Sequence, residues 1–190
     1  MDDKKEKIIR SAIEVFKEKG IEKAKVSEIV KGAGIAQGTY YLYFSSKLAV
    51  MPSIAEKMVE KTMEAIEREI KEETPFDQKL EQIIELVFEI TKEYKEIMAL
   101  IYAGLASSDY LAQWETIYQP YYKWMSNFLE NAKLEGEIRE DIDPKHTAEL
   151  IIGLIESVAE QSYLYDNQKI SIIERKKEEV FSFIKHGLKK

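Results

Sequence analysis

Residues 25–47, KVSEIVKGAGIAQGTYYLYFSSK, form the stretch of sequence that decides the fold. Apolar residues at helical spacing precede Gly34, and a second short helical pattern covers residues 37–44. Helices of fewer than three turns are not stable alone in water, so both must pack against neighbours. Two short helices joined by a tight, glycine-containing turn predict a helix-turn-helix unit, whose second helix enters the major groove of DNA.

The second helix carries more polar groups than a purely structural helix needs. Tyr40 and Phe44 lie four residues apart, so we expect them to share the buried face. Gln37, Thr39 and Tyr43 then face outward, and amide and hydroxyl groups of this kind contact phosphates and base edges. A tyrosine-rich core helix is the alternative. It is disfavoured because buried tyrosine hydroxyls need hydrogen-bond partners.

From about residue 4 to residue 51 the chain resembles the DNA-binding domain of the TetR (tetracycline-repressor-like) family of bacterial transcription regulators. The similar segments are IIRSAIEVFKEKGIEKAKV, the turn AGIAQGT and the block YYLYFSSK. Beyond them, only the length and the all-helical pattern agree with the family. The resemblance implies a regulator, typically a repressor, that binds a palindromic operator as a homodimer and is released by a small molecule.

The resemblance also implies which residues contact double-stranded DNA. Tyr41 and Lys47 would hold the phosphate backbone. Apart from the resemblance, we expect Lys25 and Ser27 at the DNA as well, with Lys25 placed to contact a phosphate. The residues that would face the groove are Gln37, Gly38, Thr39, Leu42 and Tyr43. The chain departs from the family at Lys25 and Ala36, where Ser or Thr is usual, so we expect weak N-caps at both positions.

Composition narrows the class of protein. The chain has 190 residues, enough for one or two domains with a real core, and no cysteine, so disulfides and cysteine metal sites are excluded. Neither a signal-peptide core nor a run of eighteen apolar residues is present. We therefore expect a soluble, cytoplasmic protein without a cofactor or metal.

The charge is divided unevenly along the chain. Although the formal net charge is −7, residues 1–50 contain ten Lys or Arg against seven Asp or Glu. The remaining residues contain eighteen against twenty-eight and are therefore acidic. A basic end on an acidic body is expected when only one part of a protein meets phosphate.

Helical periodicity continues to the C-terminus, and no segment predicts a strand. We expect an all-α fold of about nine helices, with a helix-turn-helix domain at residues 1–47 and a helical ligand-binding and dimerisation domain at residues 48–190. Pro52 either kinks a long linker helix or begins it. The other helices are expected at residues 4–19, 75–93, 94–105, 110–134, 144–164 and 171–186.

The most aromatic segment, residues 114–129, has aromatic residues on more than one helical face. Core packing accounts for part of this pattern, and a ligand cavity, which the family resemblance implies, accounts for the rest. A flat aromatic compound, a lipophilic cation or a fatty compound would fit such a cavity. The residues that we expect to line it are Met58, Thr62, Phe88, Met98, Tyr102, Trp114, Tyr118, Tyr121, Tyr122, Met125 and Phe128.

The last two expected helices are more apolar than a modest body requires. Two helices from each of two chains would make a four-helix dimer interface, although the same faces could pack on their own chain. The residues that we expect at the interface are Ile151, Gly153, Ile155, Val158, Phe181 and Ile184.

No pattern of catalytic residues is present, so we do not expect an enzyme. His146 and His186 are expected at the surface. Glu156 and Glu160 lie in an otherwise apolar helix, and exposure at a helix edge is favoured over a buried role. The rival function is a helical ligand-carrying or protein-interaction module that does not bind DNA, and a gel-shift assay would separate the two.

Overall fold

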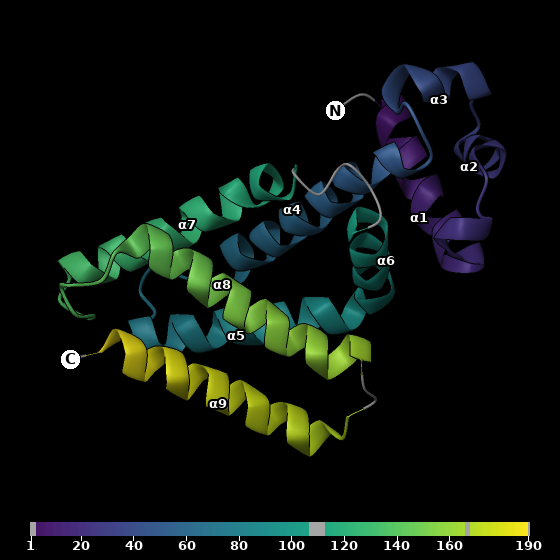
Figure 1. Cartoon of the computed structure of the whole chain (residues 1–190). Coiled ribbons are helices and arrows are strands. Elements are labelled where there is room, and N and C mark those ends of the chain that lie inside the picture. Colours follow the sequence, from purple (N-terminus) through teal and green to yellow (C-terminus); the bar gives the residue numbers. More distant parts are fainter. Residues whose placement is uncertain (1–2, 107–112, 166–167, 190) are drawn as a thin grey trace. The chain divides into compact units, whose positions relative to one another are not determined.

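The computed structural model describes residues 3–106, 113–165 and 168–189. The described residues contain nine α-helices and no strand, which confirms the expected all-α fold (Figure 1). A 3₁₀ turn, η1 (Leu48–Val50), precedes α4, and a π-helical turn, η3 (Gln161–Tyr165), follows α8. The α-helices are α1 (Asp3–Lys23), α2 (Val26–Ala33), α3 (Gln37–Tyr43), α4 (Met51–Glu69), α5 (Phe76–Glu93), α6 (Lys95–Ala106), α7 (Trp114–Leu134), α8 (Pro144–Glu160) and α9 (Ile170–Leu188).

The chain forms two compact units. The first contains Met1–Met58 and Glu96–Ile117, and the second contains Val59–Lys95 and Tyr118–Lys190. This division differs from the single boundary expected after residue 47, because the segment that contains α6 also belongs to the first unit. The assignment of DNA binding to residues 1–47 and of ligand binding and dimerisation to residues 48–190 stays a prediction.

Close packing of α1 and α2 builds the first unit. The Ser11 hydroxyl on α1 donates a 2.7 Å hydrogen bond to the carbonyl of Ile29 on α2. Gly32 faces the same serine, and a Cβ at this position would collide with the Ser11 hydroxyl. Gly34 then ends α2 in the left-handed conformation, with φ of 66°. Glycine takes this conformation at no steric cost, and the chain can therefore turn into α3.

Gly20 ends the first helical segment of α1, in agreement with the helix expected at residues 4–19. Its φ of 75° breaks the helical path, and one further turn follows it. Pro52 begins the linker helix: it is the second residue of α4, where a missing N–H costs no helical hydrogen bond. Pro120 lies inside α7, which continues through it from Trp114 to Leu134.

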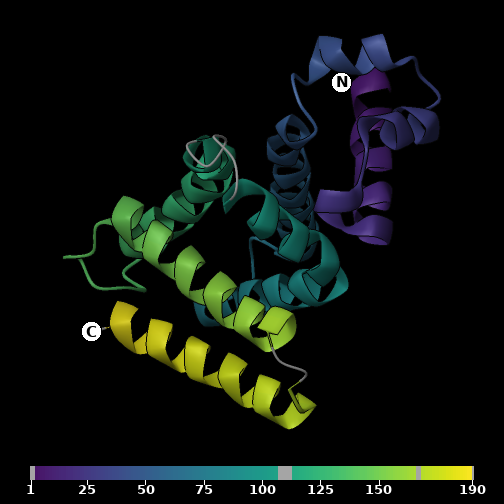
Figure 2. The same cartoon turned by 45° about the vertical axis from the view of Figure 1, so that its right-hand side comes forward.

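In the second unit, α5, α8 and α9 pack against one another, and α8 and α9 lie side by side in both views (Figures 1 and 2). Each helix turns one apolar stripe toward this core. Truncating such a residue to alanine typically costs about 2–5 kcal/mol, which makes the three helices the main source of stability in the unit. The core residues are Leu80, Ile83, Ile84 and Phe88 from α5, Ala148, Ile152, Ile155 and Ala159 from α8, and Ile173, Val180, Ile184 and Leu188 from α9.

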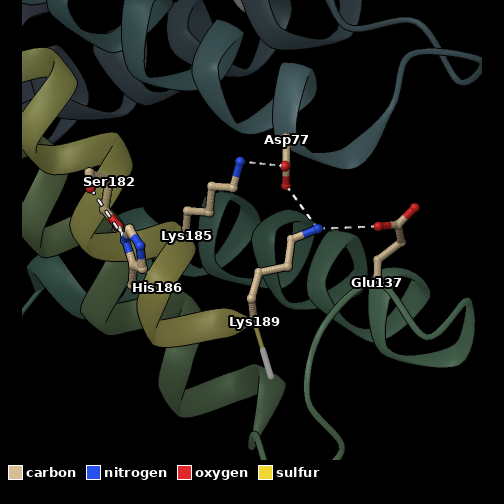
Figure 3. A network of polar contacts seen from close by, with 6 residues as sticks. All are labelled: Asp77, Glu137, Ser182, Lys185, His186 and Lys189. Carbon is tan, nitrogen blue, oxygen red and sulfur yellow. Dashed lines mark hydrogen bonds and ion pairs between the residues drawn. The ribbon is translucent and has the colours of Figure 1, made fainter.

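A polar network fastens the end of α9 to the start of α5 (Figure 3). The Asp77 carboxylate pairs with Lys185 Nζ at 2.8 Å and with Lys189 Nζ at 3.0 Å. Lys189 also pairs with Glu137 at 3.3 Å, and the backbone N–H of Arg139 donates to the carbonyl of Leu188 at 2.9 Å. Hydrogen bonding from Lys185 is the main reason why the pKa of Asp77 lies below its ordinary value.

Replacing Asp77 with Asn is expected to lower the free energy of unfolding by about 1 kcal/mol at pH 7, since the carboxylate is 32% exposed and solvent screens the pairs. Because the pKa is lowered on folding, the ionised form stabilises the fold above the unfolded pKa. That contribution is lost as the pH falls through the folded pKa, so the difference should shrink once the pH is below the ordinary Asp value of 3.8.

Urea unfolding of both proteins at pH 7 and pH 3 measures this difference. The matched control is Asp141→Asn, which removes a carboxylate from an exposed pair with Arg139. A deficit of D77N that was as large at pH 3 as at pH 7 would contradict the electrostatic origin of the effect.

Candidate functional site

The buried side of α3 is anchored by Tyr40. Its side chain is fully buried, and its hydroxyl donates to the carbonyls of Ser46 at 3.1 Å and Lys47 at 3.4 Å. Its ring packs edge-on against Tyr41 at 5.6 Å and tilted against Phe44 at 5.5 Å. Tyr40 and Phe44 share the buried face as expected, and the hydroxyl has the hydrogen-bond partners that a buried tyrosine needs.

The opposite side of α3 is open. Leu42 is 83% exposed and its neighbour Tyr41 is 49% exposed, which places two large side chains together on the surface of a seven-residue helix. Gln37 and Gly38 are also exposed, and no atom lies within 4 Å of the position of a Cβ on Gly38. A partner could therefore approach the backbone closely at this point. The two remaining residues predicted to face the groove, Thr39 and Tyr43, are half-buried.

The side chain of Lys25 does not cap the start of α2. This was expected, because Lys25 stands where the family usually has Ser or Thr. The backbone N–H of Lys25 donates instead to Glu28 Oε2 at 3.1 Å, and Glu28 Oε1 accepts from Lys19 Nζ at 2.6 Å. The hydrogen bond from Lys19 is the main reason why the pKa of Glu28 is lowered. Ala36 likewise provides no side-chain cap for α3. The side chains of Lys25 and Ser27 are exposed and can reach a partner.

Lys47 has a role that sequence reasoning missed. Its ammonium group donates to the carbonyls of Ile21 at 2.5 Å, Glu22 at 3.1 Å and Ala24 at 3.0 Å. Cations near a helix C-terminus satisfy carbonyls that have no partner within the helix. The three N–H donors of the ammonium group are thereby occupied, so a phosphate contact would require the exchange of a carbonyl. The sequence signal for this role was Gly20, because a helix that ends there leaves carbonyl groups without helical partners.

The residues predicted to line a ligand cavity fall in both units. Met58 and Met98 belong to the first unit, and the other described ones belong to the second. Met58, Thr62, Phe88, Tyr118, Tyr121 and Met125 are buried, whereas Met98, Tyr122 and Phe128 are half-buried. The side chains of Tyr102 and Trp114 lie outside the described part of the structure. That these residues form one cavity stays a prediction.

Several surface depressions lie in the second unit. A groove of about 260 Å³ between α4 and α7 is lined by Trp124 and Phe128, whose rings stack at 5.7 Å. A cleft of about 360 Å³ lies between α5, η3 and α9. Lys177 lines this cleft, and its ammonium pairs with Glu85 at 2.6 Å and with Glu174 at 3.0 Å. Of the residues predicted to bind a ligand, Phe128 lines the groove.

The expectation that Glu156 is exposed at a helix edge is wrong. The Tyr118 hydroxyl on α7 donates to Glu156 Oε2 on α8 at 3.0 Å, and burial raises the pKa of Glu156 to about 8. The periodicity of α8 held the signal, because Glu156 follows the buried Ala148 and Ile152 at four-residue steps. The nearby Tyr121 is buried, and burial and the charge of Glu156 raise the pKa of its hydroxyl well above the usual range.

Three of the expected dimer residues are corrected by the structure. Ile151, Ile155 and Ile184 are buried in the core of their own chain, so they are not available to a partner. Part of the apolar surface of α8 and of α9 therefore packs within its own chain, which was the alternative expected from the sequence. Gly153 is exposed, and Val158 and Phe181 are half-buried.

Other expectations concern chemistry that the fold could support. His146 and His186 are exposed, as expected. In the described ranges, no group of three or more His, Asp or Glu side chains is arranged to hold a metal ion. No helix in the same ranges is long and apolar enough to cross a membrane.

Two family models match this chain. Residues 8–54 match the model described as bacterial regulatory proteins, tetR family, and residues 80–188 match a tetracyclin repressor-like C-terminal domain. An HTH-type transcriptional regulator of Bacillus subtilis (strain 168), YvdT, is 44% identical over 185 residues, covering 97% of this chain and 95% of the relative.

More distant relatives are similar over most of their length. The fatty acid metabolism regulator protein of B. subtilis (strain 168) is 27% identical over 168 residues, covering 87% of this chain and 86% of that protein. The crystal structure of FadR from B. subtilis in complex with stearoyl-CoA superposes with a TM-score of 0.76 at 27% identity, covering 94% of this chain and 96% of that chain.

Replacing Glu156 with Gln is expected to stabilise the protein, and more so as the pH rises. A carboxyl group whose pKa is raised on folding binds its proton more tightly in the folded state, so stability falls as the pH rises from about 4.5 toward 8. Gln keeps the oxygen that accepts from Tyr118 but does not ionise. The expected gain in free energy of unfolding is roughly 2–3 kcal/mol at pH 7 and under about 1 kcal/mol at pH 5.

Urea unfolding at the two pH values measures the gain. Glu130→Gln removes an exposed carboxylate from α7 and serves as the control. Equal stability of wild type and E156Q at both pH values would show that Glu156 is hydrated in the folded state.

Proposed function

Because the chain belongs to the TetR family of transcriptional regulators, we propose that it is a repressor of this kind. The protein binds a palindromic DNA operator as a homodimer, and a small apolar effector that enters the helical body releases it. Its place of action is the cytoplasm, where bacterial DNA lies. We assign it no catalytic step.

The single observation that carries the DNA-binding part of the proposal is the two-sided character of α3. One side is fixed by buried Tyr40, and the other presents Gln37, Tyr41 and Leu42 to solvent. An amide that can pair with a base edge and an exposed apolar side chain that can meet a thymine methyl group are both suited to the major groove. The basic balance of residues 1–50 supports the same surface, since neutralised phosphates supply most of the non-specific affinity.

Exposed apolar residues on α8 and α9 support a dimer. Phe183 is 73% exposed and Leu150 is 72% exposed, and Ile172 is also exposed on α9. Gly153, Val158 and Phe181, predicted from the sequence, complete this dimer face. No atom lies within 4 Å of the position of a Cβ on Gly153, so a partner helix can approach closely there. Two such helices from each chain form a four-helix interface.

The proposed effector is apolar. The described aromatic residues of α7 include Tyr118, Tyr121 and Phe128, and Phe128 stacks on both Phe76 at 5.0 Å and Trp124 at 5.7 Å. Two similar proteins support this class of ligand: one is named for the regulation of fatty acid metabolism, and another was crystallised with stearoyl-CoA. Among the three classes of ligand expected from the sequence, these names favour a compound with a long aliphatic chain.

Replacing Gln37 with Ala is expected to change which bases the protein prefers, while Tyr41→Phe weakens binding to all sequences by a similar factor. Loss of a base contact costs about 1–3 kcal/mol at one position, whereas loss of a phosphate contact is independent of sequence. Selection of bound fragments from a random duplex library, followed by gel shifts at several salt concentrations, measures both effects. The selected sites should be palindromic, with half-sites separated by about one helical turn or a multiple of it. If the Q37A protein kept the base preference of the wild type, Gln37 would not be a base-contacting residue.

Replacing Phe183 with Glu is expected to give a folded monomer, because an apolar interface tolerates an unpaired charge badly. The dissociation constant of the dimer should rise at least about a hundredfold. Analytical ultracentrifugation with circular dichroism measures assembly and folding together. The control is Leu134→Glu, which places the same charge at an apolar residue that is 77% exposed but outside the proposed dimer face. A folded F183E protein that sediments as a dimer would place the interface elsewhere.

A further inference from the structure

The second unit contains one polar cluster in an otherwise apolar setting. Tyr118 and Tyr121 lie one turn apart on α7. Tyr118 donates a 3.0 Å hydrogen bond to Glu156 of α8, and the charge of Glu156 contributes to the raised pKa of Tyr121. Both tyrosines are buried, and Ile152 and Ala159, one turn before and nearly one turn after Glu156 on α8, are buried as well. Burying an ionisable group lowers the stability of the fold. A group kept in such surroundings is therefore a candidate for a functional site.

Two features show that the cluster is incomplete. The hydroxyl of Tyr121 is buried and has no hydrogen-bond partner in the described parts of the chain. Within the same ranges, Glu156 accepts a hydrogen bond from Tyr118 alone, and part of its surface remains accessible. A carboxylate accepts up to about four hydrogen bonds and a tyrosine hydroxyl both donates and accepts. The cluster therefore has unused acceptors on two neighbouring side chains.

We propose that Glu156, Tyr118 and Tyr121 bind the ammonium group of a lipophilic amine, whose apolar part contacts the aromatic side chains of the body. This inference rests on the proposed function, since it names the chemical class of the effector. An ammonium group brings three N–H donors and a positive charge, and the unused acceptors are two carboxylate oxygens and a phenolic oxygen. A long-chain acid or thioester supplies no such donors.

Aromatic rings also favour a cation in this place. The rings of Tyr118 and Tyr122 lie 5.6 Å apart and inclined at 42°, and the Tyr118 hydroxyl is the group that binds the Glu156 carboxylate. A cation within about 6 Å of an aromatic ring is attracted by the negative face of that ring. A carboxylate head group at the same place would meet the negative ring faces and would gain no ion pair with Glu156. The cluster therefore favours a cationic ligand over an anionic one.

The proton balance of binding follows from the buried carboxyl group. With a pKa of about 8, Glu156 is mostly protonated at pH 7 before the ligand arrives. When the ammonium ion binds, the carboxyl group loses its proton to the solvent and the ion pair forms. The groups that act on its charge are Tyr118 from α7, through a hydrogen bond, and Glu160 from its own helix.

Three probes that share a dodecyl chain and differ only in the head group test the inference: dodecylamine, dodecanol and dodecanoic acid, each below its critical micelle concentration. Isothermal titration calorimetry gives the affinities for the full-length protein at pH 7. Repeating the amine titration in two buffers with different ionisation enthalpies counts the protons released. The variants are Glu156→Gln and Tyr121→Phe, with the exposed Glu130→Gln as the control.

The wild-type protein should bind the amine at least about tenfold more tightly than the alcohol, because hydrogen bonds to charged groups contribute about tenfold to hundredfold. It should bind the acid most weakly, and amine binding should release nearly one proton. E156Q should lose the preference for the amine and the proton release, and Y121F should weaken amine binding several-fold. Affinity for dodecanol should change little in either variant, and E130Q should behave as the wild type.

Equal wild-type affinity for amine and alcohol, tighter binding of the acid, or proton release that persists in E156Q would each overturn the inference. Operator binding by the ligand-free wild type is measured separately by gel shift on the selected sites. If the wild type binds no operator, the proposed function fails. If it binds an operator but shows no preference for the amine, only the present inference fails.

Discussion

The burial of Tyr40 is the interaction on which the DNA-reading part of the structure depends. A helix of seven residues has too few internal hydrogen bonds to persist alone, and α3 has no side-chain cap at its start. The buried ring and its bonds to the carbonyls after the helix fix the rotation of α3 about its axis. This rotation decides that Gln37 and Leu42 face solvent. The ammonium of Lys47, at the end of the same connection, ties the chain to the last turn of α1.

The second unit shows the opposite use of burial. The apolar packing of α5, α8 and α9 is extensive enough to accommodate a carboxyl group that lowers stability above about pH 5. The Asp77 carboxylate, in contrast, lies at the surface with two lysines and stabilises the fold in its charged form. An ionised carboxylate thus lowers the stability of this unit at Glu156 and raises it at Asp77. The difference arises because Asp77 is hydrated and has charged partners. A destabilising group that is retained within a stable core is typical of functional sites.

Much of the architecture could be predicted because it depends on local patterns. Gly34 and the apolar spacing around it indicated the turn between α2 and α3, and Tyr40 with Phe44 indicated the buried face. The contacts that could not be predicted join residues far apart in the sequence. Lys47 was assigned to phosphate from a resemblance, but its carbonyl partners lie more than twenty residues earlier. Ile155 and Ile184 are as apolar as residues of a dimer interface, and only the packing of α8 and α9 on α5 shows that their own chain buries them.

A ligand can alter DNA affinity only if it binds one state of the protein better than another. For the proposed amine site, Tyr118 is the residue through which such a difference would act, because it donates the hydrogen bond to Glu156 and lies near the start of α7. Two helices, α4 and α7, contain residues of both compact units, and Tyr118 is the first residue of α7 that belongs to the second unit. Pro120, two residues later, leaves the carbonyl of Thr116 without its helical donor and so weakens the helix there. A ligand that changes the contacts of Tyr118 therefore acts on a segment of α7 that lacks one backbone hydrogen bond. Because α4 and α7 each contain residues of both units, they are the helices through which we propose that the effect reaches α3.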